Sequence, residues 1–483
     1  MKSIFYIEEK LMTLMKNLLP TMRIILFFLS LAVHADLSNN IDTHKEKYEK
    51  LALEIWSLAE MGYLENESSK LLQDTLSASG FEVKTGIAGI PTAFVAEYNN
   101  GGPVIGILAE FDALPGLSQN NTPYRESVGG DAGHACGHHL FGVGSTQAAI
   151  ALRYWLEETN TPGTIRLYGT PAEEGGSGKV YIARDGYFDD VDIVLHWHPD
   201  DNNRAFFSSS NGNKSAKFKF KGISSHAAGA PQNGRSALDG VEAMNMMVNM
   251  LREHMDEEAR IHYVITKGGL APNVVPEEAE VYYYVRHPNV DGVRNLFNRV
   301  VKAAEGAAKG TETQMVFEVM HGNYPLMPNE TLSVLIDEEL KKLGGVSYTD
   351  EENLFAQELY KTLLNPDSVI GDQQLVQPLV LTQSKGSTDV GDVSWKVPTS
   401  GVRIATWVPG TSAHSWQAVA AGGTSIGTKG STLAAKALAN SAVRLFENPS
   451  LIDLSWAEHK NNVGDHQYEA LLGDRKPPLD YRK

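Results

Sequence analysis

The sequence predicts an α/β fold in which a domain with a mixed sheet is interrupted by an inserted ferredoxin-like α+β domain. Apolar runs at 104–109 and 164–168 alternate with a helical pattern at 142–158, which is typical of a largely parallel sheet covered by helices. From about Lys214 the order becomes strand, helix, strand, strand, helix, strand, as in a ferredoxin-like sandwich. The α/β pattern returns after 323–325, and 483 residues are too many for one hydrophobic core. The smaller domain is therefore predicted to be inserted into the larger one.

The elements of the main domain follow from their periodicity. Residues 48–79 have helical spacing, Gly80 ends this helical region, and a strand follows at 81–83. Further strands are expected at 92–98 and 191–198, in addition to the two apolar runs.

The inserted domain begins with an alternation of lysine and phenylalanine at 217–221, which is typical of a half-exposed strand. The elements expected after it are a helix at 236–255, strands at 262–266 and 278–286, a helix at 290–308 and a strand at 314–320. The predicted boundaries are 36–213 and 323–450 for the two parts of the main domain, 214–322 for the inserted domain, and 451–483 for a C-terminal extension.

The first 35 residues resemble a secretory signal. Met22-Arg23 precedes the apolar run 24–33, and Val33 and Ala35 are small residues at the expected cleavage positions. The run is too short to span a bilayer as a mature helix, so no membrane anchor is expected. The pattern predicts a periplasmic or secreted protein that starts at either Met1 or Met22. The alternative is a cytoplasmic protein in which residues 1–35 are an N-terminal extension.

Charge and cysteine content limit the class of function. The net charge of −17 argues against nucleic acid as a partner, because phosphate binding needs a basic surface. An anionic substrate would need a local cationic clamp. The single cysteine, Cys136, excludes a disulfide within the chain.

The segment 133–140 contains Cys136 and three histidines within a few residues. Cys136 and His138 are two positions apart, so both side chains can face the same side of an extended segment. Thiolate and imidazole are suitable ligands for zinc and, with carboxylates, for manganese. Two other interpretations are a structural cysteine among surface histidines, and a cysteine nucleophile paired with a histidine.

Adjacent carboxylates favour the metal interpretation. Glu173 and Glu174 follow an apolar strand in a glycine-flanked turn, so one can bind metal while the other acts as general base. His196 and His198 end another strand, and either could reach the same metal. His414 lies in a loop near the end of the chain and could complete the ligand set. Together these groups are sufficient for two metal ions with shared ligands.

These motifs resemble the M20 metallopeptidases, in particular the amidohydrolase branch that has a cysteine in place of a bridging aspartate. Supporting segments are 55–60, 89–94, 109–119 and 386–395, and the resemblance extends from about Leu51 to Leu445. It implies a zinc-peptidase-like catalytic domain and an inserted domain that serves for dimerisation and as a lid.

The resemblance also implies residue roles. Glu173 would be the general base, Cys136 would bridge two divalent ions, either Mn²⁺ or Zn²⁺, and the other ligands would be His138, Glu174, His198 and His414. His196 remains the alternative to His198. The family often has an aspartate at the position of His139, and this aspartate supports the metal ligands. The resemblance therefore leaves open which residue has this supporting role here.

In the inserted domain, the resemblance implies that His226 from a partner subunit polarises the scissile carbonyl. Asn273 and Arg286 would bind the substrate carboxylate, which arginine can grip through two hydrogen bonds. The partner would be a second copy of the chain or a related M20 subunit.

The expected reaction is hydrolysis of the amide bond of an N-acyl amino acid, and the resemblance points to p-aminobenzoyl-glutamate or a related aryl-acyl glutamate. Alternatives are an aminoacylase or dipeptidase of other specificity, a general aminopeptidase, a Cys136 thiol hydrolase, and a non-catalytic ligand-binding or partner subunit.

Overall fold

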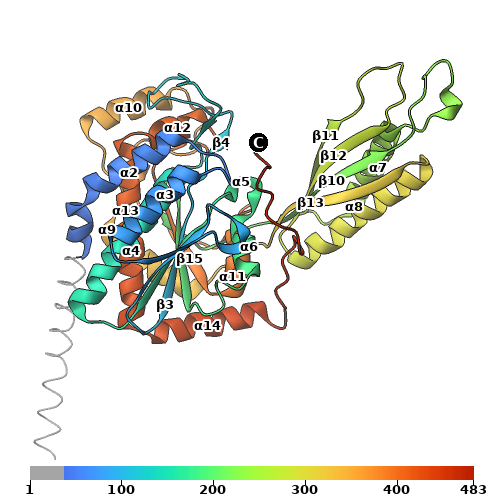
Figure 1. Cartoon of the computed structure of the whole chain (residues 1–483). Helices are drawn as coiled ribbons and strands as arrows, with labels where there is room; N and C mark the ends of the chain where they lie inside the picture. Colours follow the sequence, from blue (N-terminus) through green and yellow to red (C-terminus); the bar gives the residue numbers. More distant parts are fainter. Residues whose placement is uncertain (1–36) are drawn as a thin grey trace, which may run out of the picture.

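The computed structural model describes residues 37–483, so the predicted signal segment and the choice between Met1 and Met22 lie outside the described residues. Figure 1 shows a larger domain and a smaller domain that projects from one side of it. The larger domain contains residues from both ends of the chain, and the smaller one contains residues from the middle.

A seven-stranded mixed sheet forms the centre of the larger domain, in the order β1-β2-β6-β3-β7-β15-β8. Strands β3, β6, β7 and β15 are parallel, and β1, β2 and β8 run antiparallel to their neighbours at the two edges. This confirms the predicted mixed α/β sheet. The strands are β1 (Glu82–Thr85), β2 (Phe94–Asn99), β3 (Val104–Ala109), β6 (Thr164–Gly169), β7 (Ile193–Asp200), β8 (Arg204–Ala205) and β15 (Thr399–Ala405).

Helices cover both faces of this sheet (Figure 1). Helix α4 (His138–Thr159) packs against β3, β6 and β7 and is buried along most of its length, because α2 (Lys45–Leu58), α3 (Asn66–Ala78) and α13 (Ser425–Glu447) lie against it. Helices α6 (Gly178–Arg184) and α11 (Val390–Lys396) lie on the opposite face. Helix α4 begins four residues earlier than expected, because Gly137 has a φ of 73° and turns the chain directly into the helix.

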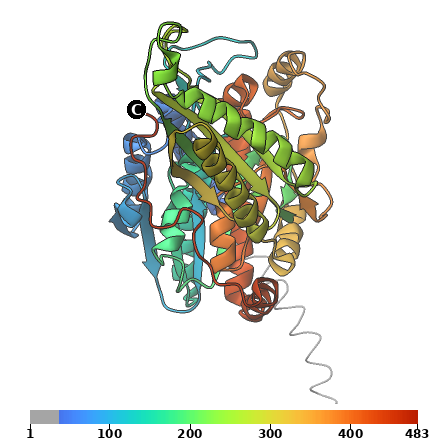
Figure 2. The same ribbon diagram turned by 90° about the vertical axis from the view of Figure 1, so that its right-hand side faces the viewer.

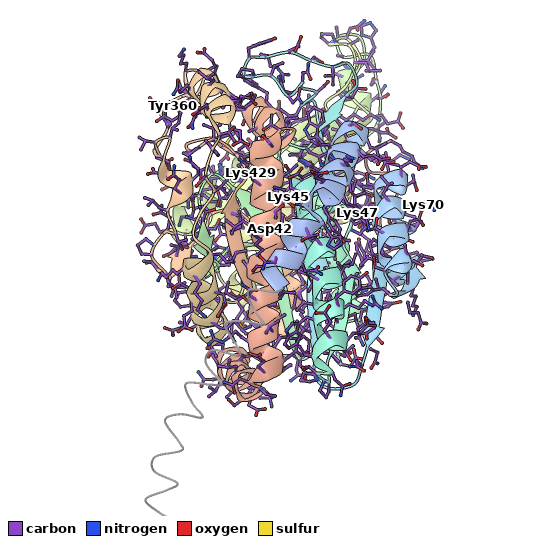
Figure 3. The ribbon with its side chains drawn as sticks, turned by 90° about the vertical axis from the view of Figure 1, so that its left-hand side faces the viewer. Asp42, Lys45, Lys47, Lys70, Tyr360 and Lys429 are labelled. Atoms are coloured by element: carbon purple, nitrogen blue, oxygen red, sulfur yellow. The ribbon has the colours of Figure 1, made fainter. Side chains whose placement is uncertain are left out.

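The other elements of this domain are short strands and outer helices. They are β4 (Leu114–Pro115), β5 (Ala132–Gly133), α5 (Glu173–Gly176), β9 (Ser208–Ser209), α9 (Glu330–Leu343), α10 (Asp350–Tyr360), β14 (Thr382–Gln383), α12 (Trp416–Gly422) and α14 (Ser450–Val463). The face turned away from the smaller domain carries exposed charged side chains, including Lys45, Lys47 and Lys70 (Figure 3). In residues 37–483, no helix combines the length and apolar character that crossing a membrane requires.

The smaller domain, here called the lid, is a four-stranded antiparallel sheet in the order β11-β12-β10-β13 with two helices on one face. This order confirms the ferredoxin-like prediction. Figure 2 shows the two helices on the side of the lid that faces away from the larger domain. The elements are β10 (Gly212–Lys221), α7 (Ala237–Leu251), β11 (Arg260–Lys267), β12 (Glu278–His287), α8 (Val290–Gly310) and β13 (Gln314–Asn323).

The lid has its own hydrophobic core, formed by the inward residues of the strands, such as Phe218 and Val281, and by the apolar stripes of α7 and α8. Helix α7 ends at Leu251, earlier than the expected residue 255, because a 3₁₀ turn at Arg252–His254 follows. The lid joins the larger domain where β10 begins and where β13 ends, and these two neighbouring crossings are called the hinge.

Candidate active site

The predicted metal-binding residues converge where the parallel strands end. Glu173 and Glu174 follow β6, His198 lies near the end of β7, and Cys136 and His138 stand at the start of α4. His414 enters from the loop after β15, where its backbone N–H donates to the carbonyl of Ala135. Open α/β sheets place their ligands at this edge of the sheet.

The side chains of these residues form three overlapping groups. Within each group, one potential ligand atom per residue lies within 4.8 Å of the others. The groups are Cys136 with His138 and His198, Cys136 with Glu174 and His414, and His138 with Glu173 and Glu174. Cys136 belongs to two of them, and its Sγ lies 3.5 Å from Nε2 of His198. The geometry therefore suits two neighbouring cations that share a thiolate.

The two histidines of β7 differ in their surroundings. They face the same side of the strand, but His196 is two positions, or about 6.6 Å, deeper in the sheet. His196 is buried with its ring 5.0 Å from that of Phe206, and it belongs to none of the three groups found in the described part of the chain. The structure thus places His198, rather than His196, beside Cys136.

Two potential ligand atoms of the site are buried without a hydrogen bond in the described structure. Nε2 of His414 lies 3.0 Å from Oε1 of Glu174, and this oxygen has no hydrogen-bond partner among residues 37–483. Nε2 of His138 is likewise without a bond in the described structure. A cation would satisfy such atoms, and the set of thiolate, imidazole and carboxylate donors fits zinc or manganese.

The electrostatics of the site also favour a bound cation. Burial raises the pKa of Glu173 well above its usual range, and the nearby Glu110 and Glu174 raise it further. Contacts with Cys136 and Glu174 raise the pKa of His414 to about 10. Neighbouring acidic groups contribute to both shifts, and divalent ions would neutralise this negative charge.

Asp112 is a site residue to which the sequence analysis assigned no role. Its Oδ1 accepts a hydrogen bond from Nδ1 of His138 at 2.8 Å, and its Oδ2 accepts one from the backbone N–H of Glu174 at 2.9 Å. His139 instead donates from Nε2 to the carbonyl of Gly422 at 3.0 Å. Asp112 therefore fills the supporting role left open at His139. A Glu-x-Asp sequence directly after the buried strand 104–109 is the signal that could have identified it.

The sequence analysis also did not identify Lys179, a buried lysine beside the site. Nζ of Lys179 lies 2.6 Å from Oε1 of Glu110 and 2.7 Å from Oδ1 of Asp389, and all three side chains are buried. Removing one partner would leave an uncompensated buried charge. The network fixes the segment before α11 against α6, next to Glu173.

Residues 172–177, here called the catalytic turn, have an unusual backbone. Ala172 and Ser177 have φ values of 57° and 60°, in the left-handed region. The surroundings hold this conformation: Oε1 of Glu65 accepts from the N–H of Ala172 at 2.9 Å, and the Tyr63 hydroxyl donates to the carbonyl of Gly176 at 2.7 Å. Strain of this kind persists only where neighbouring contacts impose it.

The Asp112→Asn variant is expected to bind divalent metal about 10- to 100-fold more weakly, because groups that orient ligating histidines contribute this much to affinity. Isothermal titration of metal into the stripped protein measures the change. The matched control is Asp131→Asn, since Asp131 is exposed. Equal metal affinities for Asp112→Asn and wild type would show that Asp112 does not support metal binding.

The lid residues predicted for the site lie at opposite ends of the lid. His226 pairs with Val274, and the N–H of Ala227 donates to the carbonyl of Asn273, so His226 and Asn273 share the outer end. Arg286 pairs with Asn213 at the hinge end. Glu278, where β12 begins, and Arg286 are about 27 Å apart along the strand. One chain therefore does not bring Arg286 together with His226 and Asn273.

Comparison with known proteins identifies the family. Residues 208–312 match the family model M20_dimer, described as a peptidase dimerisation domain. The chain is 38% identical over 476 residues to the B subunit of p-aminobenzoyl-glutamate hydrolase from Escherichia coli, and the match covers 92% of this chain and 98% of that protein. The chain belongs to the M20 peptidase family. It is 30% identical to Xaa-Arg dipeptidase of Mus musculus, over 89% of this chain and 93% of that protein.

Solved M20-like structures share the fold of this M20 chain. A putative aminohydrolase from methicillin-resistant Staphylococcus aureus has a TM-score of 0.62 at 17% identity, covering 85% of this chain and 99% of that one. The aminobenzoyl-glutamate utilization protein from Klebsiella pneumoniae has a TM-score of 0.58 at 18% identity, and the match covers 83% of this chain and 98% of that one. The predicted fold, with its inserted dimerisation domain, is confirmed, and so is the assignment to a family of hydrolases that act on amide bonds.

Proposed function

We propose that this M20 chain hydrolyses the amide bond of an N-acyl amino acid, with p-aminobenzoyl-glutamate or a related aryl-acyl glutamate as substrate. The observation that carries the proposal is the meeting of Cys136, three histidines and the Glu173-Glu174 pair at the ends of parallel strands. The name of the E. coli relative supports the choice of acyl group and amino acid.

Two divalent ions, Mn²⁺ or Zn²⁺, fit the two groups that share Cys136. His138 and His198 would complete the set for one ion, and Glu174 and His414 the set for the other. Bound ions of this kind lower the pKa of water and polarise the scissile carbonyl. Asp112 accepts hydrogen bonds from His138 and from the backbone of Glu174, so it fixes the position of one ligand from each of the two sets.

Glu173 is the general base in this proposal. It sits beside His138 and Glu174 in the catalytic turn, where it accepts a proton from water and delivers it to the leaving nitrogen. The buried Lys179 network lies next to Glu173 and holds Glu110 and Asp389 in place.

Arg286 supplies the local cation that an anionic substrate requires. Its Nε is buried and has no hydrogen-bond partner within residues 37–483. Asn213, the β10 residue that pairs with Arg286, donates to Nε2 of His321 on β13 at 2.8 Å, and Nδ1 of His321 lies 2.7 Å from the hydroxyl of Ser177, so this end of the lid lies beside the catalytic turn. A guanidinium in this position can bind the substrate carboxylate through two hydrogen bonds.

A partner subunit supplies His226 and Asn273 in this proposal, because both lie at the outer end of the lid. The lid surface suits dimerisation: β11 is an edge strand with Tyr263, Val264 and Ile265 exposed, and α7 exposes Met246 and Met250. An exposed apolar edge strand is normally covered by a partner. The partner is a second copy or a related M20 subunit, and the 30% identity over 245 residues to the A subunit of the same E. coli hydrolase supports the latter. The signal-like segment supports export as part of the proposal.

A substrate panel tests the proposed function. We expect purified protein loaded with Mn²⁺ or Zn²⁺ to cleave p-aminobenzoyl-glutamate, and to lose about 10²-fold or more in kcat/KM when the substrate α-carboxylate is amidated, because the carboxylate site is then left unpaired. Hippurate and free-amine dipeptides serve as comparison substrates. Preference for a free amine would favour the aminopeptidase alternative. Absence of turnover, both alone and with a related M20 subunit, would favour the non-catalytic alternative.

A further inference from the structure

The segment after α14, residues 464–483, is here called the C-terminal strap. Figure 1 shows it leaving the base of the larger domain, passing the hinge and ending beside α5. It contacts both domains along this path.

The first half of the strap is fixed at the hinge. Leu471 is buried against Val293 of α8 and Tyr324, and the carbonyl of Glu469 accepts hydrogen bonds from Arg294 at 2.7 Å and from the Tyr324 hydroxyl at 2.9 Å. These partners belong to the lid helix and to the chain just after β13. The strap is therefore bonded to the hinge end of the lid.

The middle of the strap bridges the lid strand β13 and helix α6. Nη1 of Arg475 donates to the carbonyl of Met320 at 2.6 Å, and Nη2 lies 3.0 Å from Oε1 of Glu318. On the other side, Nη1 of Arg184 donates to the carbonyl of Arg475 at 2.7 Å. Arg475 thus connects the lid to the helix that directly follows the catalytic turn.

The last residues of the strap hold the catalytic turn. The Tyr481 hydroxyl and Nη2 of Arg482 both donate to the carbonyl of Glu174, at 3.1 and 2.7 Å. The Tyr481 ring packs edge-on against Tyr63, with centroids 5.5 Å apart, and the Tyr63 hydroxyl binds the carbonyl of Gly176. Two carbonyls of the turn are therefore fixed by these three side chains.

We propose that Tyr481 and Arg482 are positioning residues for the catalytic turn, and that the strap transmits the position of the lid to that turn through Arg475. The inference deepens the proposed function and rests on it, since the turn carries Glu173 and Glu174. The turn has left-handed residues at both ends, so its conformation depends on the contacts that hold it. A small displacement of a positioned group can lower the rate strongly.

The experiment compares Tyr481→Phe/Arg482→Met with wild type and with the control Lys483→Met, whose lysine is the adjacent, exposed cation. With p-aminobenzoyl-glutamate as the probe, we expect the double variant to lose about 10- to 100-fold in kcat while KM stays close to the wild-type value. Arg482→Lys is expected to recover most of the kcat that Arg482→Met loses, because an ammonium can still donate to the carbonyl. A wild-type kcat in the double variant, or equal kcat in Arg482→Lys and Arg482→Met, would overturn the proposal.

Hydrogen exchange gives a second readout that needs no substrate. Amides of residues 172–177 are expected to exchange faster in the double variant and in Arg475→Met, although Arg475 does not bond to the turn. Unchanged exchange in Arg475→Met would overturn the link to the lid. A wild type that is inactive both alone and with a related M20 subunit, and whose variants still show faster exchange, would contradict the proposed function and leave the positioning role supported.

Discussion

Replacing Glu173 with glutamine is expected to lower kcat by about 10²- to 10⁴-fold, the usual contribution of a positioned general base. Glutamine has nearly the same shape and cannot accept the proton. Glu173 belongs to the group with His138 and Glu174 but to neither group that contains Cys136. The variant should therefore retain its metal while losing turnover. Steady-state kinetics and elemental analysis of the same preparation measure both quantities.

The matched control for this experiment is Glu174→Gln. Glu174 lies in the group with Cys136 and His414, so this variant is expected to lose metal as well as activity. Nearly normal turnover in Glu173→Gln would show that Glu173 is not the general base. Equal metal loss in the two variants would show that Glu173 is a ligand instead.

Removal of divalent metal is expected to abolish activity, and addition of Mn²⁺ or Zn²⁺ is expected to restore it. The physical reason is that water at neutral pH is a poor nucleophile until a cation lowers its pKa from ~15.7 to about 7. The experiment is dialysis against a chelator, followed by assay with each metal in turn. The fold is expected to persist, because the larger domain has an extensive apolar core that does not depend on the site.

The same experiment separates the metal enzyme from a thiol hydrolase. Sγ of Cys136 lies 3.5 Å from Nε2 of His198, a contact that a cysteine nucleophile and its base would also make. Full activity in the stripped protein, together with inactivation by an alkylating reagent even when metal is present, would favour the thiol mechanism. The proximity of Cys136 to Glu174 and His414 favours the metal centre.

Local patterns in the sequence predicted most of the fold. The apolar runs at β3 and β6 and the alternation in β10 each specify a strand without reference to distant residues. Helix ends were less accurate: α4 begins at His138 and α7 ends at Leu251, because a glycine turn and a 3₁₀ turn determine these boundaries.

The residues that support the site were harder to predict than those expected to bind metal. Cys136, His138 and the Glu173-Glu174 pair stand in dense motifs, whereas Lys179 is an isolated lysine whose partners are far apart in the sequence. Arg482 meets Glu174 across more than 300 positions of the chain. Such contacts depend on tertiary packing, which periodicity and spacing do not encode.

The length of the lid has a consequence for how the protein is used. In the proposed dimer, each subunit contributes Arg286 to its own active site and His226 to the active site of its partner. Neither active site is therefore complete in a separated monomer. Catalytic competence is then a property of the pair, and it falls on dilution as the pair dissociates. The concentration of subunits, or the supply of a second subunit type, would set how much enzyme is active.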